Sequence, residues 1–157
     1  MNKSKLTVEI EKSLVRKTKK KKGLYGALEA TIGFSDKGRD YERCDYMTFD
    51  SSNEICCYEI KVSIEDLKSN AKKTFIGNRN YLVMPKSMYE ELKDKRSDLI
   101  HTGMVGIIVF DERSKKLSVK RRCSLHSMNI STKVQCLEAI ARAGCRDAAK
   151  YYLTGEI

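Results

Sequence analysis

The feature that most constrains the fold is a short apolar run, residues 56–62, that carries two opposite charges. The run, Cys-Cys-Tyr-Glu-Ile-Lys-Val, is β-prone and predicts a buried strand. Because side chains alternate along a strand, Glu59 and Lys61 share one face, and the apolar residues between them face the other way. Burying a carboxylate and an ammonium costs free energy unless a partner compensates the charge. We therefore expect such a partner beside this strand.

A second acid lies shortly before this run. Asp45 begins another β-like segment, residues 45–49, and the polar residues 50–53 follow it as a turn. If the two segments pair as a hairpin around that turn, Asp45 comes near Glu59. Two converging carboxylates and a lysine suit a divalent metal ion and an attacking water.

Hydrophobic periodicity and end signals predict the remaining elements. Helices are expected at 3–22, from the N-cap Ser63 onward, at 87–95 and at 130–152, and strands at the second half of 24–34, 45–49, 56–62, 81–84, 104–110 and 117–120. The expected inner positions of the first helix are Leu6, Ile10, Leu14 and Val15. Those of the last helix are Val134, Leu137, Ile140, Ala141, Ala148 and Tyr151. The element order predicts a mixed α/β sheet in one domain, an α+β fold class.

Positive charge is concentrated in two flanks. Residues 1–22 carry +7 and residues 113–122 carry +6, which leaves the rest of the chain at −3 against a total of +10. This arrangement suits a polyanion held by the flanks, with chemistry in the middle, although a run of lysines is often only solvated surface. No aromatic stacking platform or recognition helix is evident, so we expect contacts with the backbone of a nucleic acid.

Several classes of protein are disfavoured. The six cysteines form no C-x-x-C pair, so zinc is not expected, and without an export signal we expect reduced thiols in a cytosolic protein. No apolar run approaches the roughly 20 residues of a membrane span. There is no glycine-rich phosphate loop and no nucleophile with a nearby base, which disfavours small-molecule enzymes.

The sequence that begins at the charged strand also resembles a known family. The string Glu-Ile-Lys-Val-Ser-x-x-Asp-x-x-Ser-Asn-x-Lys, residues 59–72, is similar to the E-I-K-x-S-x-x-D-x-x-S-D-x-K string of MmcB-like and related phage-encoded members of the PD-(D/E)XK nuclease superfamily. Segments 25–33, 45–47 and 75–81 also look like the phage members. The resemblance covers roughly residues 24–110.

The resemblance implies an αβββαβ core and a catalytic group made of Asp45, Glu59, Lys61 and Glu29. Asp45, Glu59 and the backbone carbonyl of Ile60 would bind Mg²⁺ or Mn²⁺, and Lys61 would orient the water or stabilise charge on phosphorus. The expected contacts to nucleic acid are Lys19, Lys20, Lys21, Lys22, Lys72, Lys120, Arg121 and Arg122.

Two positions depart from the family pattern. The family usually has Asp where this chain has Asn70, and often His where it has Asn78. Neither is an expected metal ligand. The whole chain, 1–157, is then one nuclease-like domain, with a basic helix at 3–22, a core at about 24–110, and a basic strand region and helix at 113–157.

The function that this resemblance implies is metal-dependent hydrolysis of phosphodiester bonds in DNA, and less readily RNA, in phage or mobile-element repair or recombination. One alternative is a catalytically inactive nuclease fold that only binds nucleic acid. Another is an inhibitor of a host protein. A homodimer stays open, and the expected location is the cytoplasm, that of the host if the protein is phage-encoded.

Overall fold

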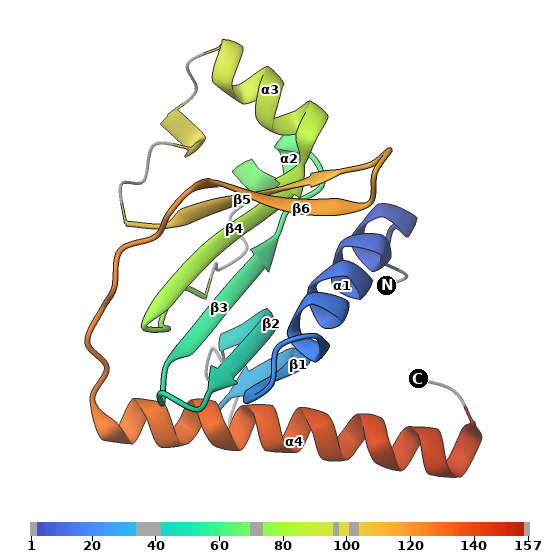
Figure 1. The fold of residues 1–157 in the computed structure, drawn as a ribbon, viewed down its shortest axis with the longest axis vertical. Coiled ribbons are helices and arrows are strands. Elements are labelled where there is room, and N and C mark those ends of the chain that lie inside the picture. Colours follow the sequence, from blue (N-terminus) through green and yellow to red (C-terminus); the bar gives the residue numbers. More distant parts are fainter. Residues whose placement is uncertain (1–2, 34–41, 70–73, 96–97, 101–103, 156–157) are drawn as a thin grey trace.

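The chain folds around one mixed sheet with helices on both faces (Figure 1). The computed structural model describes residues 3–33, 42–69, 74–95, 98–100 and 104–155. Its elements are α1 (Lys5–Lys19), β1 (Leu24–Ile32), β2 (Glu42–Asp50), β3 (Ile55–Ile60), α2 (Ile64–Lys68), β4 (Arg79–Pro85), α3 (Lys86–Asp94), the 3-10 helix η1 (Asp98–Ile100), β5 (Gly106–Asp111), β6 (Lys116–Arg121) and α4 (Ile130–Thr154). The predicted order and the α+β fold class are confirmed.

The six strands lie in the sheet in chain order, β1 to β6. Pairs β1–β2, β2–β3 and β5–β6 are antiparallel, whereas β3–β4 and β4–β5 are parallel. Parallel neighbours need a crossover connection, and these two connections contain α2 and then α3 with η1. The hairpin predicted around residues 50–53 is present, and the Asp50 carboxylate stabilises its turn by accepting the N–H groups of Ser52 and Glu54.

Helix α1 packs on one face of the sheet. Ile10 and Leu14 contact a cluster that includes Tyr46, Ile60 and Val83. Because the helical stripe is set by tertiary contacts as well as by spacing, one predicted inner residue is wrong: Val15 is 38% exposed. Thr18 is buried in α1 instead, and its hydroxyl accepts a hydrogen bond from the Tyr46 hydroxyl at 2.8 Å.

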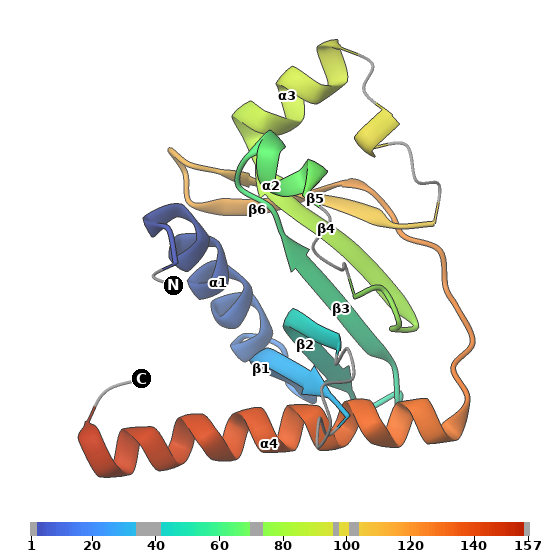
Figure 2. The same cartoon turned by 180° about the vertical axis from the view of Figure 1, so that it is seen from behind.

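The opposite face is covered by two separate groups of helices (Figure 2). Helix α4 lies over β1 to β3, where its residues Cys136 and Ala139 meet Met47, Ile55 and Cys57. Helix α3 and η1 cover β4 and β5 through a second cluster with Leu67, Leu82, Met84, Met88, Leu92, Ile100, Ile107 and Val109. Side-chain alternation in β3 therefore directs Glu59 to the side of α3 and α4, away from α1.

The predicted inner face of α4 is partly wrong. The helix buries Cys136, Ala139 and Ala143, and only Leu137 and Ile140 of the expected set pack beside them. Val134 and Tyr151 are more than half exposed. The sheet is shorter than the helix, so the last turns of α4 run past β1 and have no sheet to cover (Figure 1).

All six cysteines are free thiols, and four of them are buried. Of the helices in the described part of the chain, none is long and apolar enough to cross a membrane.

Candidate functional site

Asp45 lies where the β1–β2 ladder is interrupted, and its side chain reaches the end of β3. The β1–β2 ladder pairs Leu28 with Tyr46 and Ala30 with Cys44 but leaves out Glu29 and Asp45 between them. Asp45 Oδ2 accepts the backbone N–H of Ile60 at 2.8 Å, beyond the last β2–β3 pair. A carboxylate thus replaces the carbonyl that a regular ladder would supply, and the predicted approach of Asp45 to the Glu59 strand is confirmed.

Glu59 carries a buried carboxylate that accepts one hydrogen bond, from a backbone N–H whose residue is itself hydrogen-bonded to β2. Its side chain is 3% exposed, and Oε1 accepts the N–H of Thr74 at 3.1 Å. The Thr74 hydroxyl in turn donates to the carbonyl of Arg43 at 3.2 Å. Burial, and then the neighbouring charge of Asp45, raise the pKa of Glu59 to about 8, while the Thr74 N–H and Lys61 partly oppose this shift.

Lys61 follows β3 directly and is also buried. Its backbone N–H donates to the carbonyl of Val83 at 2.9 Å, which keeps the chain beside β4 just after the strand ends. Its ammonium lies 3.3 Å from Oδ1 of Asp66. Ser63 caps α2 by accepting the N–H of Asp66, as the sequence predicted, and this cap fixes Asp66 in the first turn.

The role of Asp66 as the partner of Lys61 was not predicted from the sequence. One sequence signal for it is an acid five residues after Lys61 on the next helix, a pair that many unrelated chains contain. The other is the Asp at this place in the string of residues 59–72. The structure thus brings Asp45, Glu59, Lys61 and Asp66 to one region, where the end of β3 meets α2.

Glu29 is held by other partners. It has a positive φ of 51°, at the same break in the ladder as Asp45. Its carboxylate lies 3.0 Å from the ammonium of Lys3, and this hydrogen bond lowers the pKa of Glu29. Lys3 also contacts Glu11 at 2.6 Å. These contacts make Glu29 a partner of the N-terminal segment, and its role as an extra metal-site acid stays a prediction.

The chemistry of the carboxylates fits a hard divalent cation. In the described part of the chain, Asp45 and Glu59 each use one oxygen for a backbone N–H, and the second oxygen of each makes no hydrogen bond. Carboxylate oxygens are the ligands that Mg²⁺ prefers. The described residues contain no cluster of three or more histidine, cysteine, aspartate or glutamate side chains suited to a metal. The expected ligand set has two carboxylates and the Ile60 carbonyl, and that carbonyl stays a prediction.

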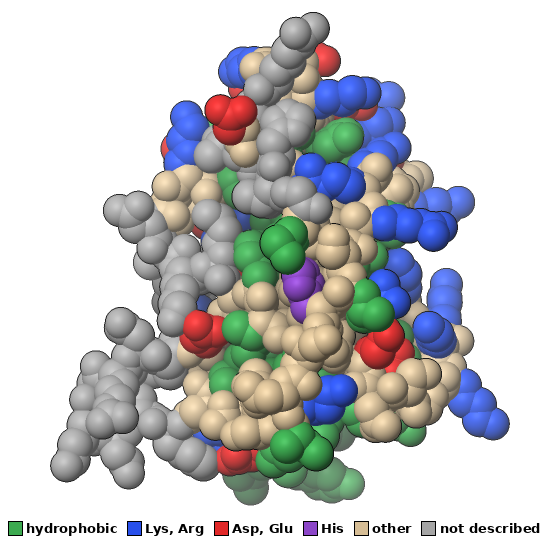
Figure 3. All heavy atoms as spheres, turned by 90° about the vertical axis from the view of Figure 1, so that its left-hand side faces the viewer, with side chains coloured by type: hydrophobic (Ala, Val, Ile, Leu, Met, Phe, Trp, Pro, Cys, Tyr) green, Lys and Arg blue, Asp and Glu red, His purple; other side chains and the backbone are tan. Residues whose placement is uncertain are grey.

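The residues expected to bind nucleic acid lie in different settings. Lys19 to Lys22 end α1 and lead into β1, and Lys120 and Arg122 are exposed at the end of β6. Arg121 instead donates twice to the carbonyl of Val105, at 3.1 and 3.0 Å, which gives it a structural role. Lys72 and Asn70 lie outside the described residues. Figure 3 shows lysine and arginine side chains gathered along one edge of the molecule.

Comparison with known proteins supports the fold. The chain is similar to the solved structure of a protein of unknown function from Silicibacter pomeroyi, with a TM-score of 0.64 and 15% sequence identity over 90% of this chain and 87% of the other. At this identity the likeness concerns the fold alone. No protein-family model matches the chain, and no curated protein matches it.

Proposed function

We propose that this protein is a metal-dependent nuclease that hydrolyses phosphodiester bonds in DNA. The observation that carries the proposal is the buried carboxylate of Glu59, whose pKa is raised to about 8 beside a second acid, Asp45, and a buried lysine. A buried, unneutralised carboxylate destabilises a fold, and perturbed carboxyl groups are concentrated at functional sites. The resemblance of residues 59–72 to PD-(D/E)XK nucleases adds the reaction class.

Each residue has a defined task in this proposal. Asp45 and Glu59 would hold Mg²⁺ or Mn²⁺ through the carboxylate oxygens that do not accept a backbone N–H. The bound ion supplies a more acidic water and neutralises charge on the phosphate. The Lys61 ammonium stabilises the negative charge that develops in the transition state or orients the water. Asp66 positions that ammonium through the 3.3 Å contact.

The test is cleavage of supercoiled plasmid and of branched, duplex and single-stranded oligonucleotides with Mg²⁺, Mn²⁺ or EDTA. We expect cleavage only with metal, and a loss of roughly 100-fold or more in Glu59→Gln and in Lys61→Ala, because both remove groups that act in the transition state. Glu90→Gln and Lys93→Ala, at exposed positions of α3, make the same chemical changes and should cleave normally.

Three results would contradict the proposal. Cleavage that persists in Glu59→Gln and Lys61→Ala would point to a contaminating nuclease or to another site. Metal-independent binding without any cleavage would favour the non-catalytic, nucleic-acid-binding alternative. Absence of both cleavage and binding would favour a protein partner, such as a host enzyme that this chain inhibits.

A further inference from the structure

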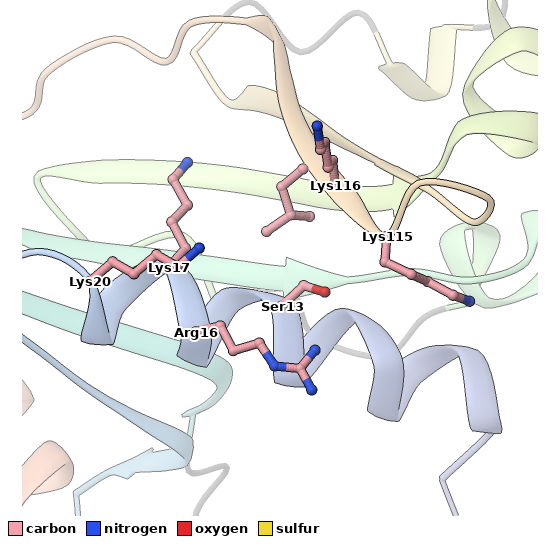
Figure 4. Close-up of a pocket in the computed structure, with 7 residues that line it drawn as sticks. Ser13, Arg16, Lys17, Lys20, Lys115 and Lys116 are labelled. Atoms are coloured by element: carbon pink, nitrogen blue, oxygen red, sulfur yellow. The ribbon is translucent and has the colours of Figure 1, made fainter.

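A basic channel lies on the α1 face of the sheet, between α1 and β6. It contains two hollows. The first, about 430 Å³, is lined by five cationic side chains: Arg16 and Lys17 from α1, Lys20 from its C-cap, and Lys115 and Lys116 from the β5–β6 turn and β6. Figure 4 shows these side chains on the two walls of the hollow. Its lining contains no acid, although Lys115 also pairs with Glu9 at 2.7 Å.

The second hollow adjoins the first, because Lys17 lines both. It has a volume of about 370 Å³ and adds the cations Lys21 and Arg79. Two acids, Asp50 and Glu54, also line it, and Glu54 pairs with Arg79 at 2.9 Å. The positive charge of the channel is therefore strongest in the first hollow and weaker in the second.

Tyrosines form the floor of the second hollow. Tyr46, Tyr58 and Tyr81 stand side by side on β2, β3 and β4, with ring centroids 5.8 Å apart in each neighbouring pair. Gly106 makes room for the end of this row, since a Cβ there would lie 2.3 Å from the Tyr81 ring. Helix α1 covers Tyr46, whereas Tyr58 and Tyr81 line the hollow.

This row of tyrosines was not predicted from the sequence. The three tyrosines are 12 and 23 residues apart along the chain, and only the strand register brings them together. The cations were also partly missed, since Arg16, Lys17, Lys115 and Lys116 were not among the expected contacts, whereas Lys20 and Lys21 were.

Positive walls beside half-buried aromatic rings that line the hollow match one kind of polymer. Phosphates bind to lysine and arginine, and bases stack on aromatic side chains only when their faces are not already stacked in a duplex. We propose that this channel binds an unpaired stretch of nucleic acid, with phosphates along the α1 and β6 cations and a base against Tyr81. An acidic peptide would use the cations but has no need of the tyrosine floor.

The channel is distinct from the carboxylate site. Tyr58 and Tyr81 face α1, whereas Glu59 faces the opposite side of the same sheet. The inference rests on the proposed function in one respect only, that the ligand is a nucleic acid. Binding of single-stranded nucleic acid in the channel therefore requires neither a metal ion nor Glu59. Cleavage and this binding can be tested separately.

The experiment measures fluorescence anisotropy of a labelled 12-nucleotide strand, as DNA and as RNA, and of the corresponding DNA duplex, in EDTA over a series of salt concentrations. We expect the single strand to bind more tightly than the duplex. The double variant Lys17→Gln/Lys116→Gln should weaken binding about tenfold or more and reduce the salt slope by roughly 1.4, because each of the two lost phosphate contacts contributes about 0.7 to that slope. The control Lys93→Gln/Lys95→Gln removes two exposed charges from the α3 end and should bind like the wild type.

The tyrosine floor has its own pair of variants. Tyr81→Leu should weaken binding about fivefold or more with an unchanged salt slope, since it removes a stacking surface and no charge. Tyr81→Phe keeps the ring and should retain wild-type affinity, and thermal unfolding of both variants identifies any loss of folding. The charge variant tests the channel independently if Tyr81→Leu does not fold.

Three results would overturn the inference: equal or tighter binding of the duplex, wild-type binding by the charge variant, or wild-type binding by a folded Tyr81→Leu. Glu59→Gln should bind the strand normally. A wild-type protein that binds the nucleic-acid strand but cleaves no substrate would reject the nuclease and keep the channel. A wild-type protein that cleaves but does not bind the strand would reject the channel alone. Comparison of the DNA and RNA strands identifies the preferred sugar.

Discussion

At the scale of single residues, Glu59 lies in surroundings that disfavour its ionised form, whereas the proposed metal binding requires that form. The carboxylate is nearly inaccessible, its neighbour Asp45 carries the same charge, and its donor is a backbone N–H. Both burial and the like charge favour the protonated form, so the pKa rises from an ordinary 4.5 to about 8. A cation bound by the two acids would offset both effects and favour the ionised carboxylates, which is a physical reason for two acids at this position.

The raised pKa predicts a pH dependence of stability. Between about pH 5 and pH 8 the folded protein keeps a proton on Glu59 that the unfolded chain has already released, so the free energy of unfolding falls as the pH rises through this window. We expect the unfolding temperature in EDTA to fall by several degrees more in the wild type than in Glu59→Gln. The exposed Glu90→Gln should retain the wild-type slope. Equal slopes in wild type and Glu59→Gln would show that Glu59 is ionised in the folded protein.

At the scale of elements, α4 shows the limit of helical periodicity. Its sequence offers apolar residues on several sides, and the helix packs through small ones, Cys136, Ala139 and Ala143. Small side chains allow close approach to β1 to β3, while the larger Tyr152 and Leu153 remain more than four-fifths exposed beyond the sheet edge.

Two alanines of α4 provide a matched test of this packing. Ala139 is 1% exposed against the sheet, and Ala148 is exposed on the same helix. Ala139→Leu should lower the free energy of unfolding by about 1–3 kcal/mol, because three added carbons have no space. Ala148→Leu, the same change in an open position, should stay within about 0.5 kcal/mol. Urea unfolding of both variants measures the difference, and equal effects would mean that α4 does not pack through Ala139.

At the scale of the whole molecule, Asn78 joins three separate parts of the chain. Its side-chain oxygen accepts the N–H of Ile55, at the start of β3, and its side-chain nitrogen donates to the carbonyl of His126, both at 2.9 Å. Its backbone carbonyl accepts the N–H of His126 at 2.8 Å. The amide thus fixes the segment between β6 and α4 against β3.

Asn78→Ala should lower the free energy of unfolding by about 1–3 kcal/mol, because it leaves the buried N–H of Ile55 without an acceptor. Chemical denaturation gives the value directly. Ser127→Ala, an exposed change beside His126, should remain within about 0.5 kcal/mol. A near-neutral Asn78→Ala would mean that the connection to α4 is held by other contacts.

Local rules were sufficient for the elements and part of the candidate site. Ser63 was correctly predicted as a cap, and the turn at 50–53 correctly predicted that Asp45 approaches the end of β3. Strand alternation applies to Glu59, whereas Lys61 lies just past the end of the strand that was predicted to contain both. These predictions depend on backbone geometry and on residues close in sequence, and both can be evaluated from the sequence alone.

The tertiary structure alone decided which distant residues meet. The Lys61–Asp66 pair, the packed face of α4, the tyrosine row and the channel beside α1 all depend on strand register and on how far each helix overlaps the sheet. Register and overlap are set by the sum of many packing contacts across the fold. The sequence by itself therefore determined the elements and their charged strand, and the packing of those elements determined the surfaces available to a partner.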